Sequence, residues 1–135
     1  MVREIDGVPV TAPELEPVQA RPENWDSVYE GMLEVVHGKR GTAKALSRGI
    51  RYSMAGKTGT AQVIGIAQNA VYNEEEVAER HRHHGLFIAF APAEAPTIAV
   101  AIIVENGGGS SAASPIARKV IDTWLFGSTD FGDPA

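Results

Sequence analysis

Two apolar segments in the C-terminal half constrain the fold more than any other feature of this chain. Residues 86–91 (Leu-Phe-Ile-Ala-Phe-Ala) end at a proline, and residues 97–104 (Thr-Ile-Ala-Val-Ala-Ile-Ile-Val) are rich in β-branched side chains. The five residues between them, Pro-Ala-Glu-Ala-Pro, predict a hairpin of two antiparallel strands. Because residues 98–104 are apolar on both faces, we expect this strand to lie mid-sheet, with helices covering both sides.

Two other segments have the apolar periodicity of amphipathic helices. In residues 24–37 apolar side chains recur at helical spacing, with Asn24 as a possible N-cap and Gly38 at the end. Residues 115–126 have a similar stripe up to Gly127, and proline at position 115 favours a helix start there. Trp25 and Trp124 lie on these apolar stripes and are predicted to be core residues.

Shorter elements are expected around these. Thr42 can cap a short helix over residues 43–48, and Asn73 can cap an acidic first turn, Glu74 to Glu76, of a helix that reaches Arg80. Ser110 and Ser111 are interpreted as part of a flexible turn after three glycines.

Composition indicates one globular unit. The 135 residues are 44% hydrophobic, and the net charge of −5 with scattered Lys and Arg argues against nucleic acid as a partner. Cys is absent, which excludes thiolate zinc sites and a Cys nucleophile. No segment approaches the roughly 18 apolar residues of a membrane span. We divide the chain into an irregular lead-in with short strands (1–23, with an Asp-Gly turn at 6–7), a main unit (24–127) and a frayed tail (128–135).

The segment 54–63, Met-Ala-Gly-Lys-Thr-Gly-Thr-Ala-Gln-Val, is the strongest candidate for chemistry. Gly-Lys-Thr can end a phosphate-binding loop, but that loop needs a glycine where this chain has Arg51, and a helix should start at the lysine. The residues that follow have strand composition instead. In a strand, Lys57 and Gly59 share one face while Thr58 and Thr60 share the other, so a strand edge can present both hydroxyls together.

The ordered set of motifs resembles the C-terminal part of the transpeptidase domain of class B penicillin-binding proteins. The resemblance covers roughly residues 20 to 126. It is strongest to the cell-elongation group of that class, penicillin-binding protein 2, in Tyr72-Asn73, in residues 78–80 and in His84. The motifs that carry it are the helix 24–37, Gly41-Thr42-Ala43, Gly56-Lys57-Thr58-Gly59-Thr60-Ala61-Gln62, Phe90-Ala91-Pro92 and Glu105-Asn106-Gly107.

The resemblance implies an α+β fold, the serine β-lactamase and penicillin-binding-protein transpeptidase fold, with an antiparallel sheet covered by helices. It implies D,D-transpeptidation of peptidoglycan stem peptides through an acyl-serine, with β-lactams as mimics of the substrate and no cofactor. Thr58 and Thr60 would bind the terminal carboxylate, and Lys57 would supply positive potential and help proton transfer. Gly59 would let substrate lie against the strand, and the Thr60 N–H would serve the oxyanion hole.

The family's Ser-x-x-Lys and Ser-x-Asn motifs do not occur in these 135 residues. We therefore expect a C-terminal fragment with an unfinished sheet that does not acylate alone and that associates with its missing N-terminal part or with itself. By resemblance, the whole protein would act with the cell-elongation machinery at the periplasmic face of the inner membrane, anchored by an N-terminal segment outside this chain.

Other interpretations stay open. A non-catalytic ligand-binding or sensor module could keep the Lys-Thr-Gly strand without the nucleophile, and a nucleotide-binding protein rests on Gly-Lys-Thr alone. The run His81-Arg82-His83-His84 could suggest a metal site, but no carboxylate partner is specified, so we expect no metal there.

Overall fold

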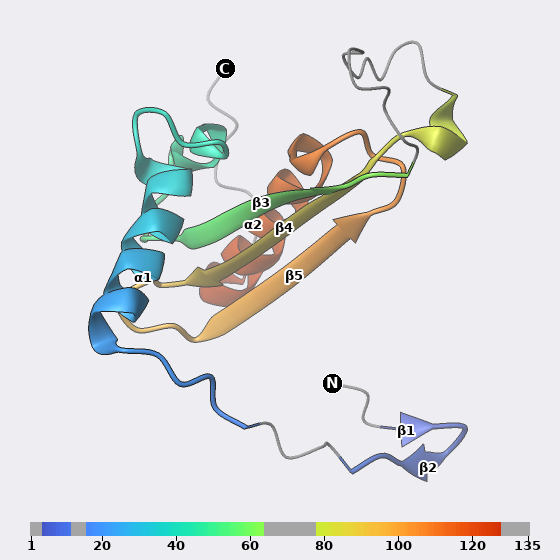
Figure 1. Cartoon of the computed structure of the whole chain (residues 1–135), viewed down its shortest axis with the longest axis horizontal. Coiled ribbons are helices and arrows are strands. Elements are labelled where there is room, and N and C mark those ends of the chain that lie inside the picture. The colour runs from blue at the N-terminus through green and yellow to red at the C-terminus, as the bar shows by residue number, and fades with distance from the viewer. Residues whose placement is uncertain (1–3, 12–15, 64–77, 128–135) are drawn as a thin grey trace.

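The computed structural model describes residues 4–11, 16–63 and 78–127 and has the α+β class that the sequence predicts (Figure 1). The predicted helix start at Asn73, its neighbours Tyr72 and Glu74 to Glu76, and the tail 128–135 lie outside these residues. The elements in chain order are β1 (Glu4–Ile5), β2 (Val8–Pro9), α1 (Pro22–His37), the 3-10 helix η1 (Lys44–Ser47), β3 (Ala55–Ala61), the 3-10 helix η3 (Glu79–His81), β4 (His84–Ala91), β5 (Ile98–Val104) and α2 (Ser110–Phe126).

The main sheet has three antiparallel strands in the order β3-β4-β5. The predicted hairpin is confirmed, with Gly85 opposite Val104 and Ala91 opposite Ile98. The expectation that β5 lies mid-sheet is wrong for the described chain, because β4 is central and β5 is an edge. Alternate β5 residues are exposed, and Ile103 keeps 66% of its surface accessible. Because β5 is apolar on both faces, both faces could be buried. The described residues cover only one of them.

Helix α2 covers one face of the sheet and forms the core with it (Figure 1). Phe87 and Ala89 of β4 point into this core, where they meet Ala113, Ala117 and Ile121 of α2. Full burial of a side chain the size of Phe is worth about 1.5–3 kcal/mol, so this layer holds the sheet and helix together. The expectation of helices on both sides of the sheet is therefore met on one side only. Helix α1 packs against β3 at the end of the sheet where β3 begins (Figure 1).

Helix α1 begins two residues before its predicted cap. Arg21 precedes the first turn, no side chain caps it, and Pro22 occupies the first helical position. Asn24 therefore lies inside the helix. Proline has a fixed φ that suits the first turn and lacks an N–H that would be unpaired there, so it decides the start. Gly38 ends the helix as predicted, but in an extended conformation with φ −68°.

Helix α2 also begins earlier than predicted. It starts at Ser110, so Ser110 and Ser111 form its first turn and Pro115 lies inside it. The prediction that both tryptophans are core residues is wrong for the described residues, because Trp25 keeps 48% and Trp124 63% of its surface exposed. Helical periodicity identifies an apolar stripe without telling whether another part of the chain covers it.

The N-terminal hairpin β1-β2 confirms the predicted short strands. Ile5 pairs with Val8 across a turn in which Asp6 and Gly7 both have positive φ, 51° and 81°. Positive φ at both central residues is the mark of a type I′ turn, whose twist matches that of the paired strands. Among the described residues no helix is long and apolar enough to cross a membrane.

Candidate active site

Strand β3 places the Lys-Thr-Gly-Thr residues on alternate faces, as the sequence predicts. Thr58 lies opposite the buried Phe87, and Thr60 lies opposite Gly85. Because directly paired residues project to the same side, both threonines belong to the face that α2 covers. Within the described residues β3 is an edge strand, so its outer edge is open to a ligand.

The face of Lys57 is open. Lys57 lies opposite Ile88, which is 49% exposed, and its ammonium donates a hydrogen bond of 2.5 Å to the Thr58 carbonyl oxygen. Gly59 lies on the same face, where a Cβ would come within 3.2 Å of the Leu86 Cβ. The lysine is thus folded along its own strand, beside an apolar face of the sheet that the described residues leave accessible.

A third hydroxyl belongs to this site. The Thr42 Oγ1 lies 2.9 Å from the Thr58 Oγ1, within hydrogen-bond distance. The prediction that Thr42 caps a helix is wrong, because η1 begins after Ala43 and has no side-chain cap. The signal in the sequence was the Gly-Thr-Ala motif at 41–43, which contributed to the resemblance without a role for its threonine.

A hollow of about 370 Å³ lies beside Thr60 on the α2 side of the sheet. Its walls come from the Thr42 loop, η1, Thr60 of β3 and the first two turns of α2. Five of the lining residues carry a hydroxyl: Thr42, Thr60, Ser110, Ser111 and Ser114. Gly85 sets how closely α2 approaches there, since a Cβ on Gly85 would lie 2.0 Å from the Gly109 carbonyl oxygen. Because the predicted turn at Ser110 and Ser111 is helical instead, the sequence prediction missed this wall.

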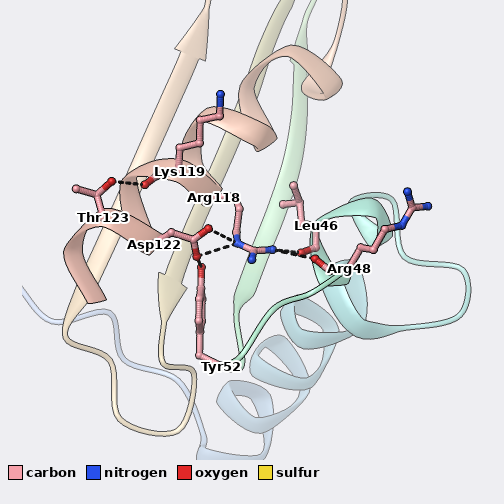
Figure 2. Close-up of polar contacts among 7 residues, drawn as sticks. All are labelled: Leu46, Arg48, Tyr52, Arg118, Lys119, Asp122 and Thr123. Carbon is pink, nitrogen blue, oxygen red and sulfur yellow. Dashed lines mark hydrogen bonds and ion pairs between the residues drawn. The ribbon is translucent and has the colours of Figure 1, made fainter. Parts of the chain in front are cut away.

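A largely buried ion pair on α2 anchors η1 and the residues that lead from η1 to β3 (Figure 2). Arg118 Nε lies 2.7 Å from Asp122 Oδ2, and the Arg118 Nη1 donates to the Leu46 carbonyl oxygen at 2.5 Å. The Tyr52 hydroxyl donates to Asp122 Oδ1 at 2.7 Å. Burial raises the pKa of Tyr52, and the hydrogen bond to Asp122 raises it further. The cluster therefore fixes η1 and the approach to β3 against α2.

The residues just before β3 are held by a second set of contacts. His37 Nε2 accepts a hydrogen bond of 3.0 Å from the Met54 N–H. The Ser53 hydroxyl donates to Glu94 in the hairpin turn and holds the pKa of that carboxyl below its ordinary value. Ser53 also accepts from the Ala93 N–H, at its hydroxyl and at its carbonyl oxygen. Helix α1, β3 and the β4-β5 turn are thereby joined at one end of the site.

The histidines at the other end bind backbone groups. His83 Nδ1 accepts from the Val63 N–H at 3.3 Å, and His84 Nδ1 accepts from the Asn106 N–H at 2.9 Å. In the part of the chain that the structure describes, no three His, Asp or Glu side chains are grouped as a metal site requires. These histidines join the start of β4 to its neighbours.

Comparison with known proteins adds to this geometry. The family described as penicillin binding protein transpeptidase domain matches residues 1–122. The peptidoglycan D,D-transpeptidase MrdA of Acinetobacter baumannii is 47% identical over 107 residues, which is 77% of this chain and 15% of the relative. MrdA of Escherichia coli K12 is 40% identical over 111 residues, 82% of this chain and 18% of the relative.

Solved structures agree. PBP2 of Pseudomonas aeruginosa, in complex with WCK 5153, is 43% identical with a TM-score of 0.67, covering 92% of this chain and 25% of that one. PBP2 of Helicobacter pylori, in complex with MreC, is 32% identical with a TM-score of 0.61, covering 78% and 18%. The chain thus spans less than a fifth of the length of the curated relatives above. With the Lys-Thr-Gly strand, the hairpin and the closing helix in place, the chain belongs to the penicillin-binding protein transpeptidase domain family.

Proposed function

We propose that this chain supplies the carboxylate-binding strand of a peptidoglycan D,D-transpeptidase that cross-links stem peptides during cell-wall elongation. The observation that carries the proposal is the edge strand β3, on which Thr58 and Thr60 share one face and Lys57, next to Thr58, lies on the other. Two hydroxyl donors beside a cation suit the carboxylate of D-Ala-D-Ala or of a β-lactam. The names of the relatives, peptidoglycan D,D-transpeptidases, support the same reaction.

In this proposal the reaction divides between two parts of the protein. A serine outside these 135 residues attacks the carbonyl of the penultimate D-Ala, and D-Ala leaves as the acyl-enzyme forms. Thr58 and Thr60 hold the terminal carboxylate, while Lys57 lowers the energy of the developing negative charge and assists proton transfer. The backbone N–H of Thr60 donates to the oxyanion, and loss of one such donor typically costs about 3 kcal/mol. An amine of a second stem peptide then resolves the acyl-enzyme.

The setting follows from the substrate. Peptidoglycan stem peptides are cross-linked outside the cytoplasm, so we place the protein at the periplasmic face of the inner membrane. Contact with the elongation machinery is supported by the Helicobacter pylori PBP2 structure, which is a complex with MreC. We propose that the N-terminal part of the same protein is the immediate partner of this chain.

Covalent labelling by a fluorescent penicillin tests the proposal. The 135-residue chain alone should stay unlabelled, and the longer protein that contains it should be labelled at a serine of a Ser-x-x-Lys motif. Thr60→Val should slow labelling of the longer protein by at least tenfold, because a donor to the carboxylate is lost. Labelling of the isolated chain at any of its own serines would refute the division of the site.

The second candidate is a non-catalytic ligand-binding module of the same fold. It is favoured by one observation, the absence of Ser-x-x-Lys from these residues. Such a module would bind penicillin or a D-Ala-D-Ala peptide reversibly, without an acyl-serine. A complete gene that encodes no Ser-x-x-Lys, together with saturable but reversible binding, would establish this alternative.

A further inference from the structure

Thr42 lies outside the Lys-Thr-Gly motif, yet its hydroxyl contacts the motif directly. The two oxygens, Thr42 Oγ1 and Thr58 Oγ1, are 2.9 Å apart, and the two residues are 16 positions apart in the sequence. Thr42 is exposed and Thr58 is half-buried, so the contact lies at the accessible margin of the site.

A hydroxyl has one proton and two acceptor positions, and this decides how the pair can work. If Thr58 donates to Thr42, it has no proton left for a carboxylate. If Thr42 donates to Thr58, the Thr58 proton is free and the Thr58 oxygen is already held in place. Only the second arrangement lets Thr58 bind an anion as a donor.

We propose that Thr42 is a positioning residue that donates to Thr58 and directs the Thr58 proton toward the carboxylate of the ligand. The inference rests on the proposed function, because it needs a carboxylate-bearing ligand at Thr58. A chain of hydrogen bonds from Thr42 through Thr58 to the anion also polarises each bond in turn and strengthens the last one.

The backbone around Thr42 is fixed from the α1 side. The Gly41 N–H donates to the Gly38 carbonyl oxygen at 3.1 Å, and the Ala43 N–H donates to the Val35 carbonyl oxygen at 2.9 Å. A Cβ on Gly41 would lie 2.4 Å from the carbonyl oxygens of Glu34 and Val35, so the loop lies directly against the end of α1. The residues on both sides of Thr42 therefore have defined positions.

The 3-10 helix η1, which directly follows this loop, is fixed from the α2 side. Arg118 holds the Leu46 carbonyl oxygen at 2.5 Å and the Arg48 carbonyl oxygen at 3.5 Å (Figure 2). Leu46 itself is buried in the core. Because α1 holds the loop itself and α2 holds η1 directly after it, the backbone of Thr42 has a defined position from which its hydroxyl can direct that of Thr58.

The test compares two acylating probes on the longer protein that contains this chain: a penicillin with a free carboxylate and its methyl ester. Thr42→Val removes the donor and keeps the shape, and Thr42→Ser restores the donor. With the free acid, we expect Thr42→Val to lower the second-order rate constant of acylation about fivefold to tenfold. Thr42→Ser should stay within about twofold of wild type, and with the ester both variants should match wild type.

A double-mutant cycle separates an effect through Thr58 from a local structural effect. If Thr42 acts through Thr58, adding Thr42→Val to a Thr58→Val protein should cause no further loss. Thr42→Ala provides a second variant without the donor, should the valine perturb the loop. Equal losses with acid and ester, additive effects in the cycle, or free-acid rates equal to wild type would each overturn the inference.

The wild-type protein separates this inference from the function on which it rests. If wild type does not react with the free acid, the proposed transpeptidase function is refuted, and the inference with it. If wild type reacts while Thr42→Val reacts equally fast, only the role of Thr42 is refuted.

Discussion

Replacing Asp122 by asparagine should destabilise the domain more than any other isosteric change of a charged residue on α2. Asp122 is 5% exposed, and its carboxylate accepts three hydrogen bonds from two side chains (Figure 2). Arg118 Nε lies 2.9 Å from Oδ1 and 2.7 Å from Oδ2, and the Tyr52 hydroxyl lies 2.7 Å from Oδ1. Asp122→Asn removes the negative charge and turns one acceptor into a donor that faces Arg118.

The magnitude follows from what remains around Arg118. Removing one partner of a buried ion pair typically costs 3–5 kcal/mol, because the other charge stays buried and unpaired. The Arg118 side chain keeps 15% of its surface accessible and still donates to the Leu46 carbonyl oxygen. Both facts lower the cost, so we expect a loss of about 3 kcal/mol. Small domains have about 5–15 kcal/mol in total, so this is a large fraction.

Urea denaturation followed by tryptophan fluorescence measures this loss. The matched control is Asp26→Asn, the same chemical change at an exposed position of α1, which should alter stability by less than about 0.5 kcal/mol. Tyr52→Phe should cost about 2 kcal/mol and, combined with Asp122→Asn, less than the sum of the two. A loss below about 1 kcal/mol for Asp122→Asn, typical of exposed pairs, would refute the reasoning.

Three further predictions concern the neighbouring contacts. Gly85→Ala should lower the free energy of unfolding by about 1–3 kcal/mol, because its Cβ would lie 2.0 Å from the Gly109 carbonyl oxygen; thermal unfolding measures the loss. The control is Gly109→Ala, where a Cβ has open space. The pKa of Tyr52 is raised in the folded state, so its contribution to stability is present below about pH 10 and falls as the pH rises further; Tyr52→Phe should flatten the alkaline limb of the unfolding profile. The pKa of Glu94 is lowered, chiefly by the hydrogen bond from Ser53, so this contribution to stability is present above the ordinary value of 4.5 and is lost as the pH falls further; Ser53→Ala should weaken the acid limb of the same unfolding profile.

The strands could be predicted because short-range patterns determine them. The two apolar runs and the prolines between them specified the β4-β5 hairpin, and the alternation of hydroxyl and glycine specified the faces of β3. The place of β5 in the sheet could not be predicted in the same way. Its sequence is apolar on both faces, whereas Ile103 in the described chain is 66% exposed. The pattern shows what burial a strand can accept and does not identify what buries it.

Helix starts were predicted less well because several side chains could serve as caps. Asn24, Thr42 and proline 115 each matched a preferred type, and the structure starts no helix at any of them. Backbone geometry decided instead. Pro22 fits the first position of α1, and α2 extends to Ser110 although Pro115 cannot donate the hydrogen bond of its turn.

The candidate site was predictable where one strand builds it. Lys57, Thr58 and Thr60 followed from β3 alone, while Thr42 reaches Thr58 from a separate loop. That loop leads into η1, which Arg118 holds from 72 residues away in the sequence. No local pattern contains that contact. Long-range anchoring of this kind is visible only once the packing of α2 against η1 is known.

The open face of the sheet connects the fold to the proposed function. Lys57 shares that face with Ile88 and Ile103, which are 49% and 66% exposed among the described residues. Burying such exposed apolar side chains against another part of the protein is favourable by about 25 cal/mol per Å². If the part of the protein that carries the nucleophile docks there, the same step covers the apolar face and removes Lys57 from water. The lysine would then become effective only when the nucleophile is in place, so assembly of the domain and completion of the active site would be one event.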